Sequence, residues 1–92
     1  KGEYSGEFAV EGGGGSEAID KPYLRVLRSG RVALALPLAN EVRIYSREGE
    51  LLSTLAPKDD PLRRPYGIVE AVDGKLWVVE GEAARVRLFS IP

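Results

Sequence analysis

The chain has 92 residues, of which 43% are apolar and 29% are charged, and its formal net charge is −1. This size fits one small unit or part of a larger one, and the absence of cysteine excludes disulfides and thiolate metal sites. The balanced charge gives no attraction to nucleic acid or acidic membranes, and no apolar run is long enough to span a bilayer, so we expect neither nucleic acid binding nor membrane insertion.

The first predicted element is a strand over residues 3–10. Tyr4, Phe8 and Val10 are separated by even numbers of residues, which places them on one face of that strand. Residues 11–21 follow and contain four consecutive glycines, which favours a connecting loop. A phosphate-binding loop is excluded because no Lys-Ser/Thr pair follows the glycines. The letters GGGGS are also those of engineered spacers, so the run is either native or introduced.

A first four-stranded unit is predicted over residues 22–56. Within it, Val32, Leu34 and Leu36 alternate with Ala33 and Ala35, so the small residues share one face of a strand. Small side chains on one face suit close stacking on a neighbouring sheet. The four strands are expected at 24–28, 31–36, 42–46 and 51–56.

A second unit, over residues 65–90, contains three predicted strands, at 68–72, 75–79 and 85–89. Asp73-Gly74 lies between the first two, and this dipeptide between β-formers is a strong hairpin signal. Both faces of the middle strand are apolar, so we expect Trp77 to be buried.

The two units are copies of one repeat. Pro22-Tyr23 matches Pro65-Tyr66 at a separation of 43 residues, whereas Gly30 matches Gly74 and Tyr45 matches Phe89 at 44. The change indicates one extra residue in the second copy, which we place near Val72-Asp73. A period of 40 to 50 residues with four short strands per unit is typical of β-propeller blades. The predicted fold is therefore all-β, with about two four-stranded antiparallel blades.

The second copy, PYGIVEAVDGKLWVVE followed by ARVRLFS, resembles the NHL repeat. That family's blades read roughly Pro-x-Gly-Ile, then Asp-Gly-x-Leu-x-Val, then Arg-Ile/Val-x-x-Phe. The first copy departs from this pattern at Leu24, Pro37 and Glu41. The resemblance covers about residues 20–90, and it implies a propeller fold far more than it implies an activity.

The repeat leaves the second unit without an outer strand, and it leaves the strand at 3–10 without a sheet. Two blades cannot close a ring, so further blades or other copies of the chain must cover the apolar faces. We expect a structural or scaffold protein that self-assembles by blade stacking and strand complementation, as a ring or a fibre. The alternatives are a fragment of a larger NHL-like propeller that binds a ligand or protein, and, third, a propeller lyase or lactonase. The predicted assembly interface comprises Tyr4, Phe8, Val10, Trp77, Val86 and Leu88.

Candidates for chemistry are better interpreted as structural. Asp59-Asp60 is an acidic pair of the kind that binds Ca²⁺, but without a third oxygen ligand at loop spacing a solvated turn is favoured. Glu70 and Glu80 are interpreted as carboxylates that line a propeller channel or its rim. No Ser or Lys stands beside a plausible general base. We therefore expect no enzyme activity and no cofactor or metal.

Basic and aromatic residues also occur together, which is a pattern that RNA-binding propellers use, but interspersed acidic residues argue against it. These residues are Tyr23 with Arg25, Arg28 and Arg31, and Tyr66 with Arg63-Arg64.

Composition also bears on the source of the protein. The chain lacks His, Cys and Met but is rich in Glu and Arg, which is the trend of hyperthermophile proteins. An N-terminus without Met favours an extracellular location if that end is a processed one.

Overall fold

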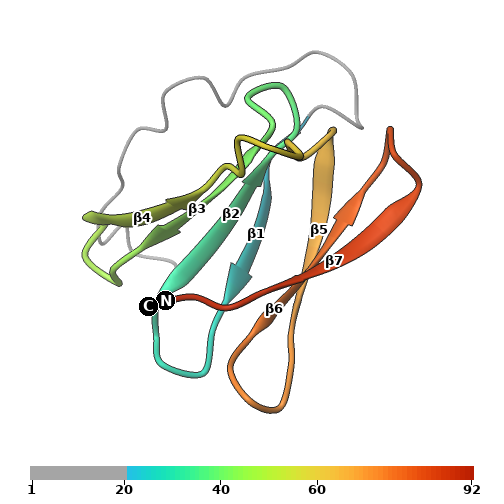
Figure 1. Ribbon diagram of the computed structural model, residues 1–92. Helices are drawn as coiled ribbons and strands as arrows, with labels where there is room; N and C mark the ends of the chain where they lie inside the picture. Colours follow the sequence, from blue (N-terminus) through green and yellow to red (C-terminus); the bar gives the residue numbers. More distant parts are fainter. Residues whose placement is uncertain (1–20) are drawn as a thin grey trace.

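The computed structural model describes residues 21–92; the strand predicted at 3–10, with Tyr4, Phe8 and Val10, lies outside the described residues. The described residues form seven β-strands in two antiparallel sheets, with no helix (Figure 1). In this range there is accordingly no helix with the length and apolar character needed to cross a membrane. The all-β prediction is confirmed at this level, and neither sheet closes on itself within residues 21–92.

Sheet A has four strands in the order of the chain. Its hairpin turns at Gly30 and Gly49 have positive φ angles of 93° and 95°, a conformation in which glycine has no steric cost. The strands are β1 (Tyr23–Val26), β2 (Val32–Leu36), β3 (Glu41–Tyr45) and β4 (Leu51–Leu55).

Sheet B has three strands, also in chain order. The Asp73-Gly74 turn is present as predicted: Gly74 has a φ of 87°, and its amide donates to the Ala71 carbonyl oxygen at 3.1 Å. The strands are β5 (Pro65–Glu70), β6 (Leu76–Glu80) and β7 (Arg85–Phe89).

The strand predictions are confirmed to within two residues, except that β5 begins at Pro65 rather than Ile68. The placement of the extra residue near Val72-Asp73 is wrong. The β1–β2 and β5–β6 turns have the same length, and the register of sheet B shifts at a bulge between Pro65 and Gly67. A bulge adds one residue to one strand without changing the rest of the ladder. Positions 44 residues apart are therefore equivalent from Tyr23 and Gly67 onward.

The two sheets pack face to face around one apolar core, with β1 and β2 closest to β5 and with β4 and β7 at the far edges (Figure 1). Ala33 and Ala35 of β2 are fully buried there, which confirms that the small-residue face is the one that stacks on a neighbouring sheet. Leu62, in the connection between the sheets, is also fully buried in this core. The core residues are Leu27, Ala33, Ala35, Val42 and Ile44 of the first copy, Leu62, and Ile68, Leu76 and Val78 of the second.

The opposite, outer faces of the sheets differ. On sheet A, Leu34, Leu36 and Tyr45 form a second buried cluster. On sheet B, Trp77 is 40% exposed. The prediction that both faces of this strand are buried is therefore wrong for the single chain. Apolar residues on both sides of a strand show that both faces can be buried, but burial also needs a neighbour on each face.

Candidate functional site

Three of the predicted interface residues lie together on the outer face of sheet B. Trp77 on β6 is directly opposite Leu88 on β7, and Val86 is opposite Val79 in the neighbouring row of the ladder. Val86 and Leu88 are 53% and 44% exposed. Since residues two apart in a strand share a face, these side chains form one surface.

The surface continues onto β5, which sequence reasoning missed. Val69 is opposite Trp77 and is 49% exposed, and Gly67 is opposite Val79, which is partly buried. Val69 could have been identified from the sequence. Successive residues of a strand point to opposite faces, so the residue after the inward-facing Ile68 points outward. We call the resulting surface, formed by Gly67, Val69, Trp77, Val79, Val86 and Leu88, the outer B face.

The inward-facing side of β7 carries charge and fixes which residues point outward. Arg85, Arg87 and Phe89 alternate with Val86 and Leu88 and face the core side. The Arg87 guanidinium lies 5.2 Å from the centroid of the Phe89 ring, within the range of a cation–π contact. Because these three side chains point inward, the side chains of Val86 and Leu88 point to the outer B face.

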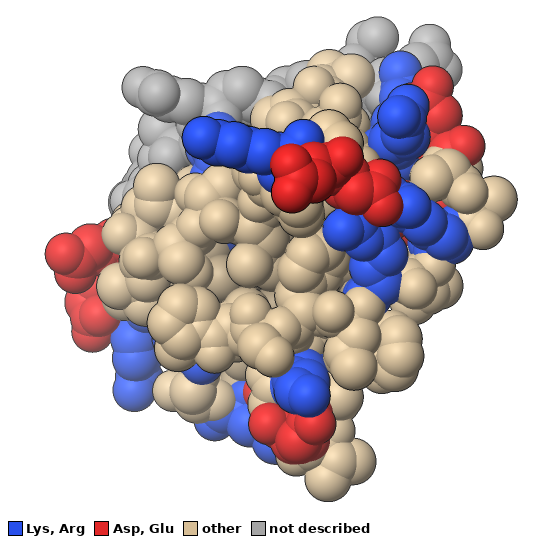
Figure 2. Space-filling view, viewed as in Figure 1, with Lys and Arg blue, Asp and Glu red and all other residues tan. Residues whose placement is uncertain are grey.

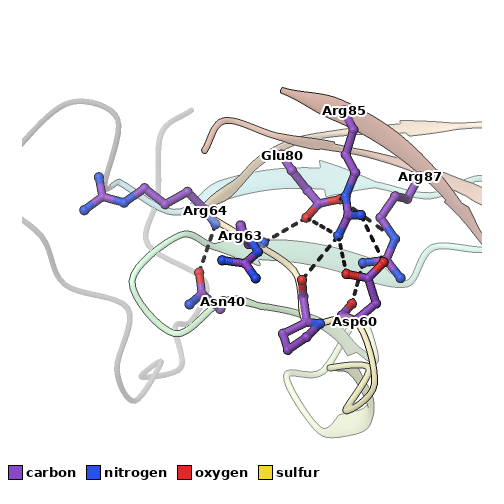
Figure 3. A network of polar contacts seen from close by, with 8 residues as sticks. Asn40, Asp60, Arg63, Arg64, Glu80, Arg85 and Arg87 are labelled. Atoms are coloured by element: carbon purple, nitrogen blue, oxygen red, sulfur yellow. Dashed lines mark hydrogen bonds and ion pairs between the residues drawn. The ribbon is translucent and has the colours of Figure 1, made fainter. Parts of the chain in front are cut away.

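Glu80 is the centre of the polar network that holds these arginines (Figure 3). Its side chain is completely buried, and its Oε2 atom accepts from Arg85 Nε at 2.6 Å and lies 3.8 Å from Arg87 Nε. Its Oε1 atom accepts from the main-chain amide of Arg63 at 2.8 Å. A buried carboxylate is costly unless it is paired and hydrogen-bonded, and here both oxygens are used. The interpretation of Glu80 as a channel or rim carboxylate is therefore wrong.

Asp60 extends this network from the connection between the sheets. Its two carboxylate oxygens accept from Nη1 and Nη2 of Arg85, each at 3.0 Å, and its carbonyl oxygen accepts from Arg87 Nη1 at 2.7 Å. The bidentate hydrogen bonds that Arg85 donates lower the pKa of Asp60, and the acceptance of its hydrogen bonds by Asp60 and Glu80 raises the pKa of Arg85. Asp60 is exposed in a bend, in keeping with the predicted solvated turn, and it also ties the connection to β7.

The remaining acidic candidates are also paired within the protein. Glu70 accepts from the main-chain amide of Arg28 at 2.9 Å and lies 3.4 Å from Arg28 Nε. On sheet A, Arg43 Nε donates to Glu41 at 2.5 Å. Over residues 21–92, no three His, Cys, Asp or Glu side chains lie close enough together to hold a metal ion.

Acidic and basic side chains lie next to one another around an uncharged centre on the face seen in Figure 2. The arginines singled out for RNA contact do not act as one group, because Arg28 is paired with Glu70 and Arg31 Nη1 donates to the main-chain oxygen of Pro92 at 2.6 Å.

In comparisons with known proteins, no protein-family model and no curated protein matches the chain. The described residues therefore offer one candidate site, the outer B face, and its composition is that of a contact surface. Contiguous exposed apolar residues on a soluble protein mark places where another surface binds.

Proposed function

We propose that this protein is a non-enzymatic scaffold whose two sheets act as β-propeller blades and which self-assembles into a ring or fibre. Assembly would proceed by stacking of blades across the outer B face and by completion of sheet B with a strand from another copy. The resemblance to the NHL repeat supports the propeller part of this proposal, because blades of that kind stack face to face.

The observation that carries the proposal is an equivalence between two faces. Positions 44 residues apart have the same place in the two ladders, so Trp77 corresponds to Ala33, Val86 to Val42 and Leu88 to Ile44. The three residues of sheet A are fully buried against sheet B. Their counterparts on the outer B face are 40% to 53% exposed. The chain thus carries one copy of a face that is covered and one copy that is not.

Strand complementation is supported by the difference between the sheets. Among the described residues, sheet B has no counterpart of β4, so β7 is an edge strand. An edge strand presents unpaired main-chain groups to which another strand can add. We propose that residues 3–10 of a second copy add there, with Tyr4, Phe8 and Val10 extending the apolar rows of Val86 and Leu88.

Analytical ultracentrifugation of two matched variants tests the proposal. Val86→Glu puts a carboxylate on the outer B face, whereas Leu38→Glu puts one in the β2–β3 turn, where the side chain is 48% exposed. We expect the wild type and Leu38→Glu to sediment as oligomers at micromolar concentration, and Val86→Glu to dissociate. Trp77 fluorescence should shift to longer wavelength on dilution of the wild type, as the indole becomes exposed.

A wild type that sediments as a compact species of 10.0 kDa would remove the self-assembly proposal. The outer B face would then be the contact for a neighbouring blade, and the alternative, a fragment of a larger propeller that binds a ligand or protein, would be favoured. Equal dissociation of both glutamate variants would show that the added charge, rather than its place on the outer B face, is responsible.

A further inference from the structure

We infer that the outer B face receives strand β1 of a second copy, through Leu24 and Val26, so that copies join head to tail. This inference rests on the proposed function and adds to it the identity of the surface that each copy presents to the next. Leu24 and Val26 are 55% and 62% exposed and face away from the core between the sheets.

The contact between the two sheets of one chain provides the template. On the sheet B side of that contact, Ile68 of β5 and Val78 of β6 are buried in the core. Their equivalents 44 residues earlier are Leu24 and Leu34, on the outer face of sheet A. The outer face of sheet A is therefore the repeat equivalent of the sheet B surface that packs on sheet A within the chain. In the same way, the outer B face is the repeat equivalent of the sheet A surface in that contact.

If two copies form this same contact one repeat further along, the strands that meet are defined. Within the chain, β5 packs against β1 and β2. One repeat further on, β1 of the next copy takes the place of β5 and packs against β5 and β6 of this copy. Leu24, in the place of the buried Ile68, would then face Trp77, which is 40% exposed. Val26, in the place of Glu70, would lie beside Val72, which is the equivalent of Arg28. Apolar side chains meet on both sides.

Exposure also selects β1 as the contacting strand. Leu34, Leu36 and Tyr45, further across the same face of sheet A, are already buried within the chain. The exposed part of the face is its β1 side, which is also the part that the repeat places against β5 and β6. An interface of this kind joins two different surfaces, so it closes into a ring or continues as a filament.

The main competing arrangement is a two-fold dimer in which two outer B faces pack on each other. The two arrangements differ in whether β1 is needed. Four glutamate variants separate them: Leu24→Glu on the proposed β1 surface, Val69→Glu and Val86→Glu on the outer B face, and Leu38→Glu as the control in the β2–β3 turn.

The experiment measures sedimentation of Leu24→Glu and Val69→Glu separately and mixed in equal amounts, with thermal melts to show that each is folded. Each variant keeps one of the two surfaces intact. In a head-to-tail assembly, each alone should lose association, and the mixture should give a 1:1 complex that grows no further. Leu38→Glu should assemble like the wild type.

The outcomes separate this inference from the proposed function. If Leu24→Glu assembles like the wild type while Val69→Glu and Val86→Glu dissociate, copies meet through outer B faces alone and the head-to-tail inference is wrong. If both variants dissociate and their mixture does not associate, the inference is also overturned. A monomeric wild type would instead remove the proposed function together with the inference.

Discussion

Asn40 and Ala84 occupy the same position in two equivalent hairpins, and both have left-handed backbone conformations, with φ angles of 55° and 53°. Each residue directly precedes the third strand of its sheet. Asn40 suits this conformation, and its side-chain oxygen also accepts from the main-chain amide of Arg64 at 2.9 Å, which fastens the hairpin to the start of sheet B. Ala84 has the same backbone conformation without a side chain that favours it.

The first prediction follows from this difference. Ala84→Gly should stabilise the fold by roughly 1 kcal/mol, since glycine removes the steric cost of the left-handed conformation. Urea denaturation measures the change. Ala83→Gly is the control, because Ala83 has no positive φ and glycine there should only increase the entropy of the unfolded chain. Equal effects of the two substitutions would contradict the strain at Ala84.

The second prediction concerns the buried carboxylate. Glu80→Gln should lower the free energy of unfolding by about 2–3 kcal/mol, because the amide replaces the charged acceptor shared by Arg85, Arg87 and the Arg63 amide. Glu82→Gln, on an exposed side chain of the same hairpin, should change stability little. Chemical denaturation of the two variants checks the difference, and a Glu80→Gln protein as stable as the wild type would show that this network contributes nothing.

The third prediction is a pH dependence. Arg85 holds the pKa of Asp60 below its ordinary value, so the folded state has the lower pKa. The contribution of this carboxylate is therefore present above the unfolded-state pKa and is lost as the pH falls through the folded-state one. Below about pH 4, the wild type should lose stability more steeply than Asp60→Asn. Denaturation curves across the acid range test this, with Asp59→Asn keeping the wild-type slope; parallel curves for Asp60→Asn and wild type would rule it out.

The fourth prediction tests strand complementation. Deletion of residues 1–10 should leave β7 without the strand that we propose it receives, so the soluble assembly should become smaller or turn into amorphous aggregate. Sedimentation and static light scattering compare the truncated and full chains. If the truncated chain assembles and melts like the full one, the proposed role of residues 3–10 in assembly is wrong. The proposed stacking across the outer B face would not be affected by that result.

Local patterns predicted most of the strands. The Asp73-Gly74 turn and the alternation around Ala33 and Ala35 depend on neighbouring residues only, and the structure contains both features. The extra residue of the second copy is wrongly predicted near Val72-Asp73, because the matching letters Pro-Tyr suggest an equivalence that the strand pairing at the Pro65–Gly67 bulge does not have. Register is fixed by pairing along the whole ladder, which a letter match cannot show.

The burial of Glu80 and the exposure of Trp77 were not predictable for a related reason. Both depend on residues far away in the sequence. Glu80 is buried because Asp60 and Arg63, in the connection between the sheets, close over it together with Arg85. Trp77 is exposed because no described residue covers that face in a single chain. Neither condition leaves a signal in the strand that contains the residue.

The replacement of Ala33 by Trp77 at equivalent positions has a consequence for the periodicity of any assembly. Close packing cannot accommodate an indole in the space of a methyl group, so a contact across Trp77 must be thicker than the contact across Ala33. Thin and thick layers would then alternate, one inside each chain and one between chains. The true repeat unit would be a pair of sheets, and averaged electron micrographs of a ring or fibre would show doublets rather than evenly spaced blades.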